Sequence, residues 1–327
     1  MTDGVDVEWV AGQLERAVVL ADPSLSPELT GGLEEFTGRP LGEGTGPVVH
    51  VGPTLPAEFR AGRRSAGDGS EGSDRLMWVH STNAGVDGML GDVSPWPEGV
   101  LLTRTVGRMG ERIGQYVLAW ALADCQDVRG FLRQHASRTW RRLPTELAEG
   151  RRAVIFGTGS IGAAVAAALR CCGIRTTGVA RTPREAPGFD EVFALEAPEL
   201  TEALGQAHWV VNALPLTPAT TGLFGPRLLS AMNGATFVNV GRGESVQTEA
   251  LAKALETGDV GGAVLDVLPD EPAPPDSPLW DLPNTVITSH SAGITTPTDV
   301  LTDFRTAWHA LRSGQRPALS VQLGLGY

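Results

Sequence analysis

Short apolar runs alternate with stretches of helical spacing through the second half of the chain. The first run, residues 153–156, is followed by a glycine-rich turn and then by an alanine-rich stretch with the spacing of a helix. Strands that alternate with helices in this way predict a parallel sheet covered on both faces. Further apolar runs that we interpret as strands lie at 176–180, 209–213, 236–240, 262–267 and 285–288, and helical stretches lie between them at 198–204, 226–232 and 247–256.

Two amphipathic stretches flank this region. Residues 296–312 predict a helix with one apolar face. The first hundred residues are less regular, with strands predicted at 47–51 and 76–81 and a loop of Gly, Ser and Asp at 65–74, so we expect a smaller domain there. Before the glycine-rich turn, residues at spacings of three and four predict a helix packed on the core: Met109, Ile113, Tyr116, Val117 and Trp120.

The composition is that of a globular chain of about two domains. Of 327 residues, 42% are hydrophobic and 20% are charged, and the net charge of −12 disfavours binding to nucleic acid or to an anionic membrane. The N-terminus lacks the basic start and apolar run of a signal peptide. Cys125, Cys171 and Cys172 lack the spacing of a metal site or a disulfide framework, so we interpret them as reduced packing residues. We therefore expect a cytoplasmic protein without a metal site.

The turn at 157–162 has the sequence GTGSIG between a predicted strand and a predicted helix. Glycines allow the backbone to approach a pyrophosphate, and the helix N-terminus offers free N–H groups and the positive end of its dipole. This context predicts a dinucleotide-binding turn. The candidate cofactor-binding residues are Gly157, Gly159, Ser160, Ile161 and Gly162.

Cofactor choice is indicated by the end of the second strand of this unit. A carboxylate at this position normally accepts hydrogen bonds from the adenosine ribose, but the chain has Arg181, Thr182 and Arg184. A guanidinium donates and cannot accept, so it suits a 2′-phosphate. We therefore predict NADP(H) in preference to NAD(H). The alternative interpretation is that both arginines are solvated loop charges.

Four polar residues follow the ends of later predicted strands: Arg242, Asp266, Glu271 and His290. In an open α/β sheet, ligands bind outside the carboxyl ends of the strands. We therefore expect these residues to converge near the cofactor. Each alone has an ordinary structural interpretation, but together they form an Arg/Glu/His set beside a dinucleotide turn.

Three segments resemble the D-isomer-specific 2-hydroxyacid dehydrogenase family. Residues 209–224 are similar to the family's stretch beside the adenosine, 278–284 to its approach to the catalytic histidine, and 78–87 to its substrate loop. The resemblance extends from about residue 99 to 293. Residues 115–122 and Trp140 most resemble the glyoxylate/hydroxypyruvate reductase branch.

The resemblance implies two Rossmann-like or flavodoxin-like α/β domains with parallel sheets and an active-site cleft between the domains. Residues 1–103 and 294–327 would form a discontinuous substrate-binding domain, and 104–293 the dinucleotide-binding domain. The family is usually dimeric, so a homodimer is expected. Arg181 departs from the acid of the NAD-using members, and the N-terminal sequence is atypical of the family.

The resemblance also implies roles for individual residues. Arg242 would bind the carboxylate and carbonyl oxygen of a 2-oxo acid, His290 would be the general acid and base, and Glu271 would orient the imidazole. His80 is expected to line the cleft, and the remaining histidines to be structural. Leu214, Pro215, Val240 and Asp266 would contact the cofactor, with Asp266 at the nicotinamide. The substrate carboxylate would be bound by the loop of Asn83, Ala84 and Gly85.

The predicted function is NADPH-dependent reduction of a small 2-oxo acid, glyoxylate- or hydroxypyruvate-like, to the D-2-hydroxy acid. Two alternatives stay open at this stage. The same fold can act on a bulkier 2-oxo acid of specialised metabolism, or the chain can be a nicotinamide-sensing binding protein without enzymatic activity. Product analysis with a panel of 2-oxo acids would distinguish the first alternative from the predicted function. Cofactor-dependent capture of a partner protein, without turnover of any 2-oxo acid, would favour the second.

Overall fold

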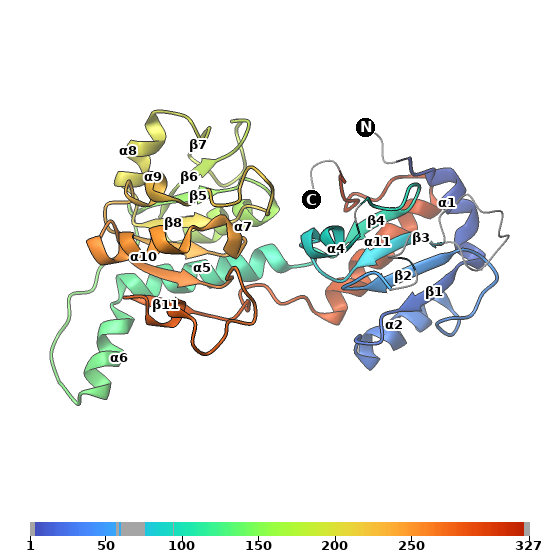
Figure 1. Cartoon of the computed structure of the whole chain (residues 1–327), viewed down its shortest axis with the longest axis horizontal. Coiled ribbons are helices and arrows are strands. Elements are labelled where there is room, and N and C mark those ends of the chain that lie inside the picture. The colour runs from blue at the N-terminus through green and yellow to red at the C-terminus, as the bar shows by residue number, and fades with distance from the viewer. Residues whose placement is uncertain (1–3, 57–58, 60–75, 94, 324–327) are drawn as a thin grey trace. The chain divides into compact units, whose positions relative to one another are not determined.

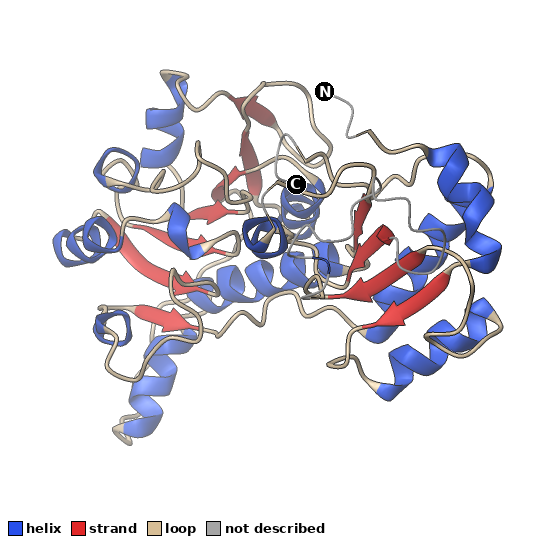
Figure 2. Cartoon of the chain, turned by 45° about the vertical axis from the view of Figure 1, so that its right-hand side comes forward, coloured by secondary structure: helices blue, strands red, loops and turns tan. Residues whose placement is uncertain are grey.

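The computed structural model describes residues 4–56, 59, 76–93 and 95–323. The predicted loop at 65–74 lies outside the described residues. The chain divides into two compact units, Met1–Arg108 with Thr295–Tyr327 and Met109–Ile294. Each unit is built on one parallel sheet with helices packed on it (Figure 1, Figure 2). The α/β fold with parallel sheets predicted from the sequence is confirmed.

The first unit has a four-stranded sheet in the order β1-β2-β3-β4, with all neighbours parallel. Its two inner strands are buried along their whole length, because apolar clusters cover both faces of the sheet. The strands are β1 Val18–Ala21, β2 Val48–Gly52, β3 Leu76–Ser81 and β4 Leu101–Arg104, and the helices are α1 Val7–Gln13, η1 Leu14–Arg16, α2 Pro27–Thr37, α4 Asp87–Asp92 and α11 Pro297–Arg312.

The C-terminal helix α11 completes the first unit. Phe304 of this helix stacks on Trp78 of β3, with ring centroids 5.0 Å apart. Thr296 and Asp299 form a capping box at its start, which explains why the helix begins there. Asp303 accepts hydrogen bonds from the amides of Val106 and Gly107, so α11 also holds the segment where the chain leaves this unit.

The second unit has a seven-stranded parallel sheet in the order β11-β10-β9-β8-β5-β6-β7. From β5 the chain builds the sheet outward in one direction through β6 and β7, and from β8 it builds in the other direction, so the order reverses beside β5. The strands are β5 Arg152–Phe156, β6 Arg175–Val179, β7 Glu191–Phe193, β8 Trp209–Asn212, β9 Ala235–Asn239, β10 Val260–Leu265 and β11 Thr285–Ile287.

Helices cover both faces of this sheet over two apolar clusters. The longest, α5, carries the apolar face predicted from Met109 to Trp120. The reversal beside β5 is where open α/β sheets bind ligands, outside the carboxyl ends of the strands. The helices are α5 Met109–Cys125, α6 Val128–Ala136, α7 Ser160–Arg170, α8 Glu199–Gly205, α9 Pro226–Leu229, η2 Gly243–Ser245, α10 Thr248–Thr257 and η3 Pro278–Asp281.

The predicted elements compare well with these bounds. All six strands predicted in the second unit are present within two residues, and β2 and β3 are found as expected. Three short strands were not predicted, β1, β4 and β7. The packing role predicted for the cysteines is wrong for Cys171, which is exposed, whereas Cys125 is buried. Across the described residues, we find no helix with the length and hydropathy of a membrane span.

Phe237 allows a direct test of the packing of the second unit. Its side chain is fully buried in β9, and its ring centroid lies 5.0 Å from that of Phe224. Truncation leaves a cavity that the surrounding strands cannot fill, so we expect Phe237→Ala to lower the free energy of unfolding by about 3–5 kcal/mol. Guanidinium denaturation followed by circular dichroism measures this loss.

The matched variant Phe237→Leu keeps most of the buried volume. It should lose clearly less stability than the alanine variant, because the remaining side chain still fills the space beside Phe224. Equal losses in the two variants would contradict the assignment of Phe237 to a tightly packed position.

Candidate active site

The glycine-rich turn between β5 and α7 is shaped by close approaches of the backbone. Gly157 has φ +103°, and a Cβ there would lie 2.9 Å from Ala213 O. At Gly162 a Cβ would lie 1.8 Å from Gly157 O, so no side chain fits. At Gly159, in contrast, a Cβ would meet no atom within 4 Å. The turn therefore packs tightly against the protein at Gly157 and Gly162, whereas no protein atom lies close to the Cβ position of Gly159.

The Gly159 side of the turn faces the N-terminus of α7, which has no side-chain cap. Ser160 and Ile161 begin this helix, so their N–H groups have no intrahelical acceptor. Free N–H groups and the positive end of a helix dipole suit a pyrophosphate. The chemistry of this turn therefore fits the dinucleotide predicted from the sequence.

Exposed cations follow β6. Arg181, Thr182 and Arg184 are exposed, and within the described part of the chain neither guanidinium has a hydrogen-bond or ion-pair partner. On the other side of β5, the Leu214 side chain lies next to Gly157. Leu214 and Pro215 are half-buried after β8, and Val240 is buried after β9. These residues all follow the carboxyl ends of strands, at the edge predicted to bind the cofactor.

A buried polar network holds the turn that carries Arg242. Asn212 and Asn239 end the neighbouring strands β8 and β9 and are paired in register. Asn212 Nδ2 donates to Asn239 Oδ1 at 2.9 Å and to Ser245 Oγ at 2.7 Å. Asn239 Nδ2 and Ser245 Oγ both donate to Arg242 O, at 3.0 and 2.6 Å. The backbone of Arg242 is therefore fixed by side chains that the sequence analysis did not identify.

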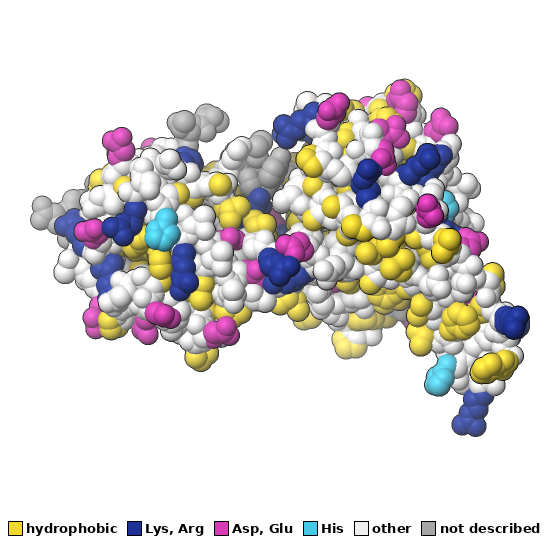
Figure 3. Space-filling model, turned by 180° about the vertical axis from the view of Figure 1, so that it is seen from behind, with side chains coloured by type: hydrophobic (Ala, Val, Ile, Leu, Met, Phe, Trp, Pro, Cys, Tyr) yellow, Lys and Arg dark blue, Asp and Glu magenta, His cyan; other side chains and the backbone are white. Residues whose placement is uncertain are grey.

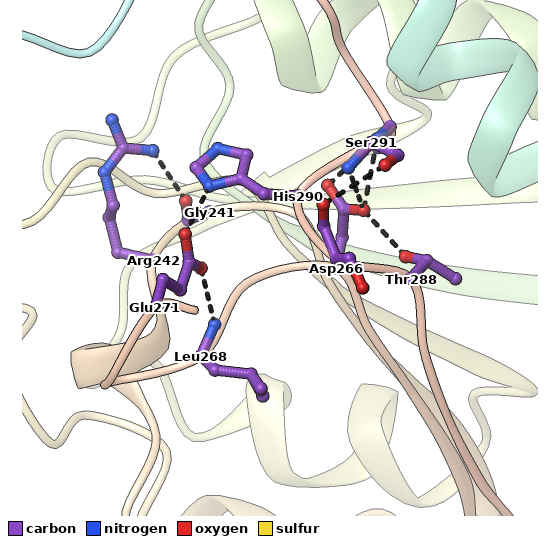
Figure 4. Close-up of polar contacts among 10 residues, drawn as sticks. Gly241, Arg242, Asp266, Leu268, Glu271, Thr288, His290 and Ser291 are labelled. Carbon is purple, nitrogen blue, oxygen red and sulfur yellow. Dashed lines mark hydrogen bonds and ion pairs between the residues drawn. The ribbon is translucent and has the colours of Figure 1, made fainter. Parts of the chain in front are cut away.

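The Arg242 turn packs directly on the segment that leads to Glu271. A Cβ at Gly243 would lie 1.9 Å from the carbonyl carbon of Leu268, so only glycine permits this approach. The Arg242 side chain is partly buried, and its Nη1 donates to Gly241 O at 2.7 Å. Figure 4 shows the side chains of Arg242, Glu271 and His290 gathered in one place. These three side chains therefore converge within the second unit, as the sequence predicts.

Glu271 binds His290 on one side and the backbone on the other. His290 Nδ1 lies 2.7 Å from Glu271 Oε2, and Leu268 N donates to Glu271 Oε1 at 2.8 Å. A carboxylate only accepts, so this contact keeps a proton on Nδ1 and leaves Nε2 for a second proton. The His290 side chain is 54% exposed. The imidazole is thus oriented on one side and accessible on the other.

The loop that carries His290 has an unusual backbone. Ser289 and His290 have φ of +56° and +53°, in the left-handed region that costs most residues about 1–3 kcal/mol each. Asp266, which is 3% exposed, holds this loop. Its Oδ1 accepts from Ser291 N at 2.8 Å, and its Oδ2 accepts from Ala292 N at 3.0 Å. Buried hydrogen bonds to a carboxylate therefore compensate for the strained backbone.

A half-buried tyrosine, Tyr116, extends this arrangement to α5. Thr288 Oγ1 donates to Asp266 Oδ1 at 2.7 Å, so its single proton is used there and Tyr116 donates to Thr288 at 2.6 Å. Burial raises the pKa of Tyr116 to about 12, and the negative charge of Asp266 acts in the same direction. Tyr116 is therefore a neutral donor. Its helical spacing in the sequence predicts only an apolar packing role.

The loop predicted to bind a carboxylate lies in the first unit, after β3. Ser81 Oγ accepts from Asn83 N at 3.1 Å, and Arg104 Nη1 donates to Ala84 O at 3.1 Å. The N–H groups of Ala84 and Gly85 donate to none of the described residues. Asn83 itself is exposed. Two backbone donors of this loop are thus without an acceptor among the described residues, and side chains hold the loop in place.

His80, expected to line a cleft, is instead part of the core. It is fully buried, with Nδ1 2.7 Å from Thr103 Oγ1 and Nε2 3.1 Å from Thr105 Oγ1. Burial lowers the pKa of His80 to about 3, so the ring is neutral. The prediction for His80 is wrong because its side chain points into the core of the first unit, where its ring centroid lies 5.5 Å from that of Phe304 on α11. No group of three or more His, Cys, Asp or Glu side chains is placed to hold a metal ion among the residues that we describe.

Comparison with curated proteins and solved structures places this site in context. A protein of Streptomyces coelicolor, described as an uncharacterised protein in the mprR 3′ region, is 51% identical over 294 residues, which cover 89% of this chain and 100% of that protein. A D-isomer specific 2-hydroxyacid dehydrogenase family protein from Aeromonas salmonicida has a TM-score of 0.79 and 30% identity, over 94% of this chain and 99% of that one.

Two further structures contain nicotinamide cofactors. A D-isomer specific 2-hydroxyacid dehydrogenase from Xanthobacter autotrophicus, in complex with NADPH and MES, has a TM-score of 0.81 and 27% identity over 95% of this chain and 100% of that one. An NADPH-dependent glyoxylate/hydroxypyruvate reductase from Sinorhizobium meliloti, in complex with NADP and sulfate, has a TM-score of 0.80 and 26% identity over 95% of this chain and 99% of that one.

Residues 118–292 match the family model described as the NAD binding domain of D-isomer specific 2-hydroxyacid dehydrogenases. This segment contains the glycine-rich turn and the whole Arg242, Glu271 and His290 set. The resemblance seen in the sequence is confirmed, and the protein is an oxidoreductase that uses a nicotinamide cofactor. The chain belongs to the D-isomer specific 2-hydroxyacid dehydrogenase family.

Proposed function

We propose that this protein reduces a small 2-oxo acid, glyoxylate- or hydroxypyruvate-like, to the D-2-hydroxy acid with NADPH. The observation that carries the proposal is the His290–Glu271 contact of 2.7 Å beside Arg242, with the imidazole exposed. The likeness to the Sinorhizobium meliloti glyoxylate/hydroxypyruvate reductase supports the choice of substrate. The predicted location in the cytoplasm stays a prediction.

Three residues of the chain have separate roles in the proposed reaction: Arg242, His290 and Glu271. When bound at the glycine-rich turn, NADPH would supply a hydride for the carbonyl carbon. The Arg242 guanidinium binds the substrate carboxylate and carbonyl oxygen, and its charge offsets the negative charge that develops on that oxygen. His290 Nε2 donates the proton to the oxygen, because imidazole exchanges protons near neutral pH. Glu271 orients the ring and stabilises the imidazolium.

The remaining predicted contacts form part of the same proposal. Asp266 positions the His290 loop, and its contact with the nicotinamide stays a prediction. Binding of the substrate carboxylate by Asn83, Ala84 and Gly85 is supported by the two free N–H groups of that loop. We keep 1–103 with 294–327 as the substrate-binding domain and 104–293 as the cofactor domain, close to the two compact units of the fold.

The preference for NADP(H) over NAD(H) rests on Arg181 and Arg184. Both guanidinium groups are exposed after β6 and lack ion-pair partners among the described residues, so their donors are available to a 2′-phosphate. The NADPH and NADP complexes of the Xanthobacter and Sinorhizobium relatives support this preference.

A homodimer through the second unit is supported by exposed apolar side chains near the end of α5, on α6 and after it. Helix α6 and the segment that follows project from the rest of this unit (Figure 1), and hydrophobic side chains lie on the projecting part (Figure 3). Leu132 is 63% exposed and Trp140 fully exposed. Grouped exposed apolar residues are typical of an interface. The group comprises Leu122, Val128, Phe131, Leu132, Trp140 and Leu147.

Replacing His290 tests the mechanism. We expect His290→Gln to lower the rate of NADPH oxidation with glyoxylate or hydroxypyruvate by at least about 100-fold, because general acid catalysis is lost. The Kd for NADPH should stay unchanged. Initial rates are followed by the absorbance of the reduced nicotinamide, and His309→Gln, an exposed change on α11, is the control.

Unchanged turnover in His290→Gln would contradict its role. If the wild type oxidises NADPH only with bulkier 2-oxo acids, the substrate assignment is wrong and the alternative of specialised metabolism holds. If NADPH binds but no 2-oxo acid is reduced, the nicotinamide-sensing alternative replaces the enzyme.

Arg181 tests cofactor choice. Replacement by Asp removes the donors for a 2′-phosphate and supplies an acceptor for ribose hydroxyls, so the ratio of kcat/KM for NADPH to that for NADH should fall about 10- to 100-fold. Steady-state kinetics with both cofactors measures the ratio. Arg227→Asp, on the surface at α9, should leave the ratio unchanged. A ratio that is the same in Arg181→Asp and the wild type would favour the interpretation of solvated loop charges.

Leu132 tests the dimer. The wild type should have the mass of two chains in light scattering after size exclusion, and Leu132→Glu that of one chain, because a buried charge opposes association. Lys253→Glu, exposed on α10, serves as the control and should stay dimeric. A wild type with the mass of one chain would rule out the homodimer.

A further inference from the structure

The loop after β3 and the neighbouring end of β4 contain three sources of hydrogen-bond donors for an anion. The N–H groups of Ala84 and Gly85 donate to none of the described residues. Arg104, the last residue of β4, donates from Nη1 to Ala84 O at 3.1 Å. The guanidinium is therefore held against the same short segment that offers the two free amides.

This segment is a rigid part of the first unit. Ser81 of β3 is paired in register with Arg104 of β4, at the carboxyl ends of two parallel strands, where open α/β sheets bind ligands. Thr105 Oγ1 donates to Ser81 O at 2.9 Å, and Ser81 Oγ donates to Asn83 O at 3.2 Å. Bonds from both neighbouring segments thus fix the strand end and the start of the loop.

Among the described residues, no carboxylate balances the charge of Arg104. The Arg104 side chain is half-buried. Burial lowers the pKa of the guanidinium, with no neighbouring acid acting in the opposite direction. Some arginines of this chain do have such a partner, as Arg312 has Glu15 at 3.6 Å. A partly desolvated cation without a counter-ion favours the arrival of an anion.

We propose that Arg104 is a specificity-determining residue, whose charge holds the substrate carboxylate on the N–H groups of Ala84 and Gly85. It selects anionic 2-oxo acids over neutral 2-oxo compounds of the same size. This inference rests on the proposed function, and adds to it a charged residue of the first unit. Arg104 takes no part in proton or hydride transfer.

Binding of oxamate, an unreactive 2-oxo carboxylate, to the NADPH-saturated protein tests this role. Arg104→Gln keeps a donor for Ala84 O but removes the charge, so the Kd for oxamate in calorimetry should rise about 10- to 100-fold. Arg104→Lys keeps the charge and should bind oxamate more tightly than the glutamine variant. The KM for pyruvamide, a neutral 2-oxo amide, should be the same in all three proteins.

The matched control is Arg39→Gln. Arg39 also donates to backbone carbonyls in the first unit, those of Glu15 and Leu14, but lies away from the β3 loop. It should bind oxamate as the wild type does. The Kd for NADPH should be unchanged in every variant, which shows that each protein is folded.

The outcomes separate this inference from the proposed function. If Arg104→Gln binds oxamate as the wild type does, the role of Arg104 is overturned while turnover of glyoxylate still supports the function. If glutamine and lysine variants weaken oxamate and pyruvamide equally, Arg104 only shapes the loop and the inference is also overturned. Loss of oxamate binding in Arg104→Gln with no glyoxylate turnover in the wild type would retain the anion site and reject the reductase.

Discussion

The geometry of the candidate site depends on the hydrogen bonds that the buried carboxylate of Asp266 accepts. It follows β10 and accepts hydrogen bonds from the amides of Ser291 and Ala292 and from the hydroxyl of Thr288. These bonds hold Ser289 and His290 in a left-handed backbone that neither residue type favours. Because the backbone is held there, the imidazole meets Glu271 at hydrogen-bond distance.

Each member of the Arg242, Glu271 and His290 set has its own support. The asparagines that end β8 and β9 hold the turn of Arg242, Leu268 N holds Glu271, and Asp266 holds the loop of His290. The supports come from adjacent strands of one parallel sheet, so the sheet register sets their spacing. Groups held in advance cost no reorganisation when charge develops on a substrate, which is why such support favours catalysis.

Much of this arrangement could be predicted from the sequence. The glycine-rich turn, the strands around it and the four polar residues after later strands carry local signals, because periodicity and glycine placement act over a few residues. The supporting contacts carry no such signal. Asn212 and Asn239 are 27 residues apart, and their bond depends on the register of β8 against β9. The only sequence signal for this bond is that two consecutive strands both end in Asn. Tyr116 has no signal for a polar role beyond its helical spacing.

The histidines show why residue type alone is a poor guide to role. His80 and His290 both lie near the end of a parallel strand, yet His80 is enclosed by Thr103 and Thr105 and neutral, whereas His290 is exposed and bonded to a carboxylate. The difference follows from whether the residue lies inside the strand or after it. His80 lies within β3, and its side chain enters the core, whereas His290 follows β11 in a loop.

Position relative to the strands also distinguishes the arginines that we assign to ligand binding. The chain carries a net charge of −12, which repels anions at long range, yet Arg104, Arg181 and Arg242 each end or follow a parallel strand at its carboxyl end. Long-range repulsion is screened within about 10 Å at moderate salt, whereas a partly buried guanidinium acts at contact. An acidic protein can therefore bind an anionic cofactor and an anionic substrate, provided that some of its cations lie where the sheet binds ligands.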